Sequence, residues 1–178
     1  MSFILNYYLH RVEVMLWISL LGVFSVAYLS TYAEEGYVIE SLFISPFSTG
    51  STAIIQDIVN IEKDAIKVSL LGNNVTDINL VENGSSPLKY VFVKDNELLI
   101  DNINSDNVRI TYKTSGILQK EDRQWILSVN STKNFMVMLP LDAKISFLEK
   151  TPSSLRLVGS QHLLTFEHGP AKIRYSTN

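Results

Sequence analysis

The sequence predicts an all-β fold, an antiparallel immunoglobulin-like β-sandwich, preceded by one N-terminal transmembrane or signal helix. Residues 14–33 form an uncharged run, and from Tyr37 onward short apolar stretches alternate with turn sequences about every ten residues. That spacing is typical of antiparallel sandwiches and barrels. The prediction divides the chain into a cytoplasmic N-terminal segment (1–13), a membrane anchor or signal helix (14–33) and an extracytoplasmic β-sandwich domain (34–178).

The uncharged run is long enough to cross a membrane. A helix over residues 14–33 would cover about 30 Å, the thickness of the hydrocarbon core of a bilayer. Arg11 precedes the run, and Glu34 and Glu35 follow it. Because positive charge tends to stay on the cytoplasmic side, this arrangement predicts that the remainder of the chain is exported.

Two main interpretations of this segment stay open. A retained single-pass anchor fits the long, weakly basic start of the chain, where Tyr7 and Tyr8 would lie at the membrane interface. A cleaved secretory signal fits the small residue Ala33 at the end of the run. A buried helix of a soluble fold is a third interpretation, and residues 10–13 match the processing site of a type IV pilin-like leader poorly. Both main interpretations export the domain.

Alternating apolar and polar residues predict half-buried strands. Val108, Ile110 and Tyr112 would share one face, opposite Arg109 and Thr111. The same alternation places further side chains on inner faces: Leu88, Tyr90, Phe92, Trp125, Leu127, Val129, Ala171, Ile173 and Tyr175.

Two local signals sharpen this prediction. Asn83-Gly84 predicts a tight type I′ hairpin turn, because both central positions of that turn need a positive φ. Residues 53–61 have isoleucines at helical spacing, but they are crowded with β-branched residues, which favour a strand.

Composition and motifs argue against most chemistries. The 178-residue chain has a formal net charge of −3 and no cysteine, which argues against nucleic-acid binding and excludes disulfides and thiol chemistry. The sequence has no nucleophile elbow, no phosphate-binding glycine loop and no His-Glu-x-x-His pair. We therefore predict that the protein is not an enzyme, with no catalytic residues, no cofactor, no metal site and no evident small-molecule substrate.

Three weaker patterns are better explained by ordinary structural roles. His162 and His168 would lie about 20 Å apart in an extended strand, too far to share a metal ion. Ser160 and His162 share a face but have no carboxylate behind the histidine. The oxygen-rich stretch 101–107 lacks the glycine and the closing glutamate of a calcium loop, so a solvated turn is expected there.

Three Asn-x-Ser/Thr sequons follow the apolar run, and all three fall at predicted turns. They begin at Asn74, Asn83 and Asn130. Because an exported glycoprotein carries glycans on its surface loops, these asparagines are candidate N-glycosylation sites.

The last part of the chain resembles a known group of proteins. The motifs are Arg109–Lys113, Gln124–Val129, Val137–Ala143 with its Leu-Pro turn, and Leu164–Tyr175 with its final Ile-x-Tyr strand. Together they resemble the β-sandwich domains of small single-pass archaeal surface proteins, over residues 109–178. The resemblance implies an extracytoplasmic immunoglobulin-like domain and carries over no catalytic residue.

These observations together predict a function and a location. The expected protein is a membrane-anchored extracytoplasmic β-sandwich with a structural or protein-interaction role at the cell surface, and with a protein partner in the cell envelope. The membrane contact would be made by residues 14–33. The alternatives are an accessory subunit of a larger membrane protein complex and a secreted ligand-binding domain.

Overall fold

The computed structural model describes residues 36–84 and 86–177, which belong to one compact unit, Glu35–Asn178. The predicted segments 1–13 and 14–33 lie outside the described residues. Among the described residues, no helix has the length and apolar character that crossing a membrane requires.

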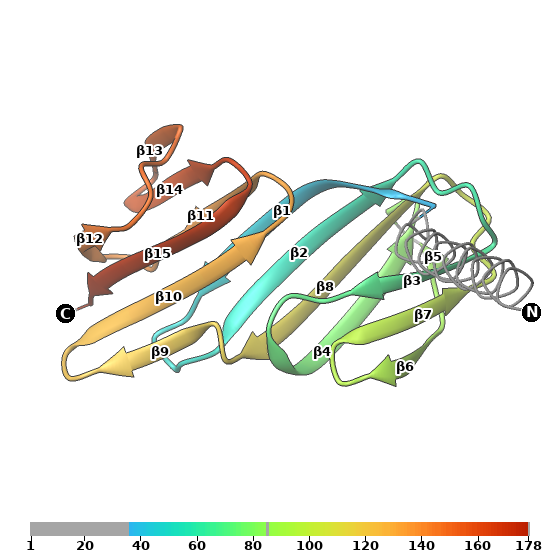
Figure 1. Ribbon diagram of the computed structural model, residues 1–178, viewed down its shortest axis with the longest axis horizontal. Helices are drawn as coiled ribbons and strands as arrows, with labels where there is room; N and C mark the ends of the chain where they lie inside the picture. Colours follow the sequence, from blue (N-terminus) through green and yellow to red (C-terminus); the bar gives the residue numbers. More distant parts are fainter. Residues whose placement is uncertain (1–35, 85, 178) are drawn as a thin grey trace, which may run out of the picture. The chain divides into compact units, whose positions relative to one another are not determined.

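The described residues form fifteen strands in three sheets (Figure 1). The eight-stranded sheet has the order β13 (Ser154–Val158), β14 (Gln161–Phe166), β11 (Phe135–Met138), β1 (Val38–Pro46), β2 (Thr52–Val59), β8 (Asn107–Ser115), β4 (Asn73–Glu82) and β5 (Ser86–Pro87). The four-stranded sheet has the order β12 (Lys144–Leu148), β15 (Gly169–Ser176), β10 (Gln124–Ser131) and β9 (Leu118–Glu121). The three-stranded sheet has the order β3 (Ala65–Ser69), β7 (Glu97–Asp101) and β6 (Tyr90–Lys94).

The predicted all-β, mostly antiparallel class is confirmed for the described residues. The sheet arrangement differs from the two antiparallel sheets of an immunoglobulin-like sandwich, because there are three sheets and β1 pairs with β11 in parallel, Phe43 beside Met136. Alternation and turn spacing predict which residues are strands, but they do not predict which strands pair. The β1–β11 pair joins strands that are separated by all of β2 to β10.

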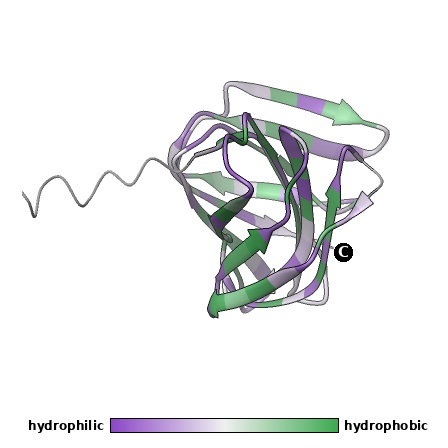
Figure 2. Cartoon of the chain, turned by 90° about the vertical axis from the view of Figure 1, so that its right-hand side faces the viewer, coloured by the Kyte–Doolittle hydropathy of each residue, from purple (hydrophilic) through white to green (hydrophobic). Residues whose placement is uncertain are grey.

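The core lies where the three sheets bring their apolar faces together. In β2, Thr52, Ile54, Gln56 and Ile58 are buried and alternate with partly exposed residues, so the expected strand is confirmed. Figure 2 shows the matching alternation of hydrophilic and hydrophobic bands along the strands. One core cluster draws on every sheet, including Ile54 and Ile110 of the largest, Leu98 and Ile100 of the smallest, and Leu127 and Ile173 of the third.

The strand β4 has the most irregular backbone of the large sheet. Its pairing with β8 shifts register twice, between Asn73 and Thr76 and between Thr76 and Asn79. Asn74 and Asp77 have positive φ angles of 49° and 53°. The strand ends in the predicted tight turn, where Asn83 and Gly84 have φ angles of 48° and 76°. Each bulge turns the strand away from a straight, pairable edge.

Candidate functional site

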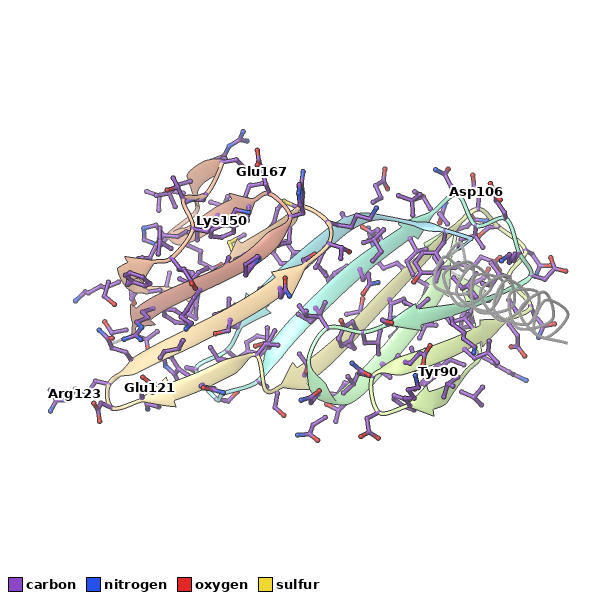
Figure 3. All side chains as sticks on the ribbon, in the orientation of Figure 1. Tyr90, Asp106, Glu121, Arg123, Lys150 and Glu167 are labelled. Carbon is purple, nitrogen blue, oxygen red and sulfur yellow. The ribbon has the colours of Figure 1, made fainter. Side chains whose placement is uncertain are left out.

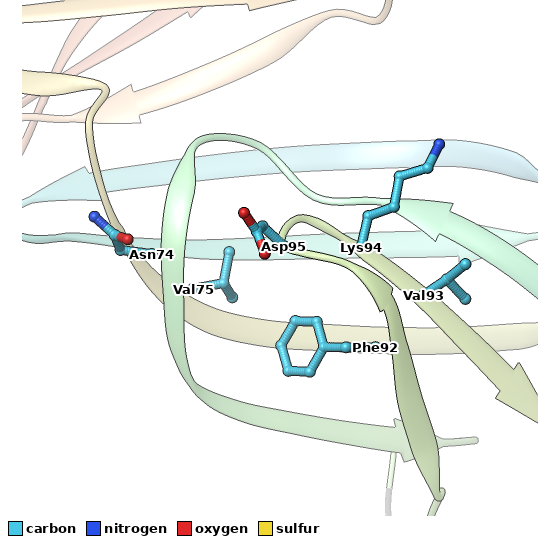
Figure 4. A pocket seen from close by; sticks show the side chains of 6 residues that line it. All are labelled: Asn74, Val75, Phe92, Val93, Lys94 and Asp95. Atoms are coloured by element: carbon cyan, nitrogen blue, oxygen red, sulfur yellow. The ribbon is translucent and has the colours of Figure 1, made fainter.

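A recess of about 440 Å³ lies between the bulged start of β4 and the β6–β7 hairpin (Figure 4). It is lined by Asn74, Val75, Phe92, Val93, Lys94 and Asp95. Figure 4 shows the Phe92 ring beneath Val75, with the Asp95 carboxylate above them. The recess therefore has an apolar floor and a polar rim.

The strand β6 is the last strand of the three-stranded sheet, so within the described residues one of its edges has no neighbouring strand. Val91, Phe92 and Val93 are 59%, 49% and 43% exposed, which is unusual for three consecutive large apolar residues. The Phe92 ring meets Tyr90 edge to face at 5.9 Å between centroids. Lys94 forms an ion pair with Glu97 at 3.4 Å across the hairpin turn.

The recess combines exposed polar groups with apolar side chains. Asn74, Lys94 and Asp95 are all exposed and form its polar part. The floor can accept an apolar side chain against Phe92, and the free edge of β6 can offer backbone hydrogen bonds.

A charged cluster crosses β1, β2 and β8 elsewhere on the large sheet. The Asp57 carboxylate accepts hydrogen bonds from Arg109 Nε at 2.6 Å, from Arg109 Nη2 at 3.1 Å and from Ser41 Oγ at 2.7 Å. The hydrogen bond from Arg109 holds the pKa of Asp57 below its ordinary value, and the same contact raises the pKa of Arg109. Both carboxylate oxygens of Asp57 are already hydrogen-bonded within the protein. We therefore interpret this cluster as holding β1, β2 and β8 in register.

The three sequon asparagines lie on the surface at separate places. Asn74 is exposed in β4, where its Nδ2 donates to Ser115 Oγ at 3.1 Å. Asn83 is exposed at the β4–β5 turn, beside Gly84, whose surroundings are open. Asn130 is exposed near the end of β10 and pairs with Pro170 of β15. The structure does not bring these candidate modification sites together.

The weaker sequence patterns also stay apart. His162 lies in β14, and His168 follows that strand, where its backbone N–H donates to Asn134 Oδ1 at 3.0 Å. In the oxygen-rich stretch 101–107, Asn104 Nδ2 donates to the Asn102 carbonyl at 3.0 Å and Ser105 Oγ to the Asn107 carbonyl at 2.8 Å. These local bonds are those of a turn.

Comparison with known proteins identifies the fold. The sequence matches no protein-family model and no curated protein. An aminopeptidase N family protein from Idiomarina loihiensis matches with a TM-score of 0.55 and 8% identity, over 75% of this chain and 29% of its own. An M1 zinc metallopeptidase from Deinococcus radiodurans matches with a TM-score of 0.48 and 12% identity, over 80% of this chain and 42% of its own. This chain thus spans less than a third of the first protein.

The first of these likenesses contradicts the predicted function. The matching fold belongs to part of an aminopeptidase N family protein, so the prediction of a structural or protein-interaction role at the cell surface is wrong. The functional prediction was wrong because the spacing of the strands was taken as specific to one class of β domain. Regular turns every few residues recur in many β-rich domains, whereas the three-sheet strand order is particular and cannot be read from spacing.

Residues 36–84 and 86–177 contain no group of three or more His, Asp or Glu side chains arranged to hold a metal ion. We derive no zinc-dependent step from these residues. What the described surface offers is strand edges with exposed apolar side chains, on β6 and on β13.

Proposed function

We propose that Glu35–Asn178 is the β domain of a peptidase-related protein, and that it holds extended peptide segments without cleaving them. The single observation that carries this proposal is the likeness of its fold to part of an aminopeptidase N family protein. The argument is one of fold analogy, since a fold by itself does not fix an activity. We assign hydrolysis to none of the described residues.

The surface supports peptide binding by strand addition. An extended peptide can pair with a free sheet edge through its backbone while pockets beside that edge accept alternate side chains. The described domain has such edges, and the recess beside β6 is lined by Phe92 and Val75.

We further propose that residues 14–33 attach the chain to a membrane as a single-pass helix, with the β domain on the extracytoplasmic side. The support is the uncharged run itself and the position of Arg11 before it. Extraction of membranes with alkaline carbonate should leave the chain in the pellet, and protease added outside intact cells should digest the β domain. Release into the supernatant, or protection from the protease, would contradict this placement.

The function is tested with the full chain immobilised in mild detergent and a defined mixture of synthetic peptides. Mass spectrometry of the retained and free fractions reports binding and cleavage together. We expect a subset of peptides, extended and apolar, to be retained at full length. Retention of none would overturn the proposal, and shortening of peptides by the purified chain would show that it is itself a peptidase.

A further inference from the structure

The strand β13 ends the eight-stranded sheet and leaves a regular edge open. Its five residues pair with β14 from Ser154 beside Thr165 to Val158 beside Gln161, with no shift in register. Among the described residues, no strand pairs with its other side. A regular edge of this kind presents a row of unpaired backbone groups.

The side chains of this edge are apolar and exposed. Leu155, Leu157 and Val158 are 54%, 68% and 49% exposed. Arg156 is the one charged residue of the strand, and it forms no ion pair with another described residue. The strand contains no proline, lysine or bulge, and Arg156 is the single charge that could oppose pairing with a neighbouring strand.

The edge is held in place from behind. Phe166 of β14 is fully buried and stacks on Phe135 of β11 at 5.2 Å between ring centroids. Lys150 Nζ donates to the carbonyls of Glu167 and His168 at 3.1 and 2.6 Å, which closes the base of the hairpin (Figure 3). A strand that is fixed before binding loses little conformational entropy when a partner pairs with it.

We propose that β13 is the peptide-binding edge of this domain, and that it pairs with an extended apolar segment carrying a carboxylate opposite Arg156. The inference rests on the proposed function and names its site and the chemistry of its ligand. Leu155 and Leu157 share one face of the strand and would contact apolar side chains of the segment. The guanidinium of Arg156, which forms no ion pair within residues 36–84 and 86–177, selects an acidic residue at the centre.

A second copy of this chain fits the edge less well. Antiparallel pairing of two β13 strands over all five residues is centred on Arg156, so the two guanidinium groups would stand opposite each other. Like charges directly opposite across strands oppose pairing. Charge complementarity therefore favours an acidic peptide.

The experiment measures fluorescence anisotropy of a fluorescein-labelled peptide of the same length as β13, with threonine at each end, valine flanking the centre and glutamate at the centre. The protein is the full chain in mild detergent. Two matched peptides carry lysine or proline at the centre. We expect the lysine peptide to bind about two- to fivefold more weakly, as cross-strand charge pairs do, and the proline peptide to lose binding because it lacks the central N–H.

Three variants locate the site. Leu157→Lys should abolish binding by charging the edge, and Arg156→Glu should reverse the preference between the glutamate and lysine peptides. Val91→Lys tests the other exposed edge, that of β6, and a fourth variant, Phe47→Lys just after β1, is the control that should bind like the wild-type chain.

The outcomes separate this inference from the proposed function. Binding that Val91→Lys abolishes and Leu157→Lys spares would place the site on β6 and overturn the inference, while the domain would still hold peptides. A different result would be a concentration-dependent dimer that Leu157→Lys abolishes and that the peptide does not affect. That result would show that β13 pairs with a second copy of the chain, and it would overturn the inference. If no peptide is retained in any test, both proposals fail.

Discussion

The two ends of the eight-stranded sheet are built in opposite ways. At one end, β4 is bulged twice and has positive φ angles at Asn74 and Asp77. It is then partly covered by β5, where Val81 pairs with Pro87. At the other end, β13 is regular, apolar and uncovered among the described residues.

The comparison shows which end of the sheet is protected from pairing with a further strand and which end is not. Bulges and prolines prevent a neighbouring chain from continuing a sheet, so the β4 end is closed to strand addition. The same sheet keeps a straight edge at β13, where such protection is missing. The predictions below disrupt one end or the other, in order of decreasing effect.

Phe166→Ala should have the largest effect, because it removes the stack with Phe135 behind the β13–β14 hairpin. Deleting a fully buried phenylalanine ring costs about 3–5 kcal/mol of unfolding free energy. Urea denaturation of the full chain, followed by tryptophan fluorescence, measures the loss. Leu157→Ala is the control and should stay within about 0.5 kcal/mol of wild type, since Leu157 is 68% exposed. Equal losses in the two variants would refute the assigned packing.

Gly72→Ala should lower the unfolding free energy by about 2–4 kcal/mol at the β4 end, because it combines overpacking with a left-handed backbone. A Cβ at Gly72 would lie 2.3 Å from Thr114 Oγ1, and the φ angle there is 84°. Gly159→Ala is the matched control at the β13–β14 turn, where φ is 62° and nothing lies within 4 Å. The same denaturation assay should show a clearly smaller loss for Gly159→Ala, and a reversed order would contradict the account of close packing at Gly72.

Tyr112→Phe should cost about 1–3 kcal/mol, because the backbone N–H of Leu71 donates to the Tyr112 hydroxyl at 2.7 Å and would be left unsatisfied. Tyr175→Phe is the matched control. Tyr175 is equally buried, but its hydroxyl has no hydrogen-bond partner among the described residues, so its removal should be neutral or slightly stabilising. Burial raises the pKa of both tyrosines well above the ordinary value. If the denaturation midpoint falls equally in Tyr112→Phe and Tyr175→Phe, the hydrogen bond from Leu71 to Tyr112 does not contribute to stability.

Asp57→Asn should have the smallest effect, less than about 1 kcal/mol, as expected of a partly exposed ion pair. The pKa of Asp57 is lowered in the folded state by the hydrogen bond from Arg109, so the folded state binds this proton less readily than the unfolded state. The stabilisation is therefore complete above the ordinary pKa of 3.8 and is lost as the pH falls through the lowered value. The difference in unfolding free energy between wild type and Asp57→Asn should disappear on acidification from about pH 6 to about pH 2.5. A difference that stays constant with pH would show that the Asp57–Arg109 ion pair is not its cause.

The sequence predicted the strands of this domain better than their arrangement. Alternation placed Val108, Ile110 and Tyr112 in the core, and all three are buried there. The type I′ turn at Asn83-Gly84 is also present, because its φ requirement is local. The parallel contact of β1 with β11 depends on residues far apart in the chain, and no local pattern encodes it.

The candidate site was missed for a related reason. An exposed edge differs from a half-buried strand only in what lies beside it, so Leu155 and Leu157 read as ordinary strand residues. Phe92 was expected on an inner face, yet it is 49% exposed on β6, which has no neighbouring strand on one side among the described residues. A signal was present in the run 154–158, where alternation is weak and the only charge is Arg156.

Hydrogen–deuterium exchange of the full chain, with and without the central-glutamate peptide, tests the contrast between the two sheet ends most directly. We predict that amides of residues 154–158 exchange more slowly when the peptide is present, while those of residues 73–78 and 90–94 are unchanged. Protection that appears in β4 or β6 instead, or in no segment at a peptide concentration that saturates the anisotropy signal, would contradict the assignment of β13 as the open edge.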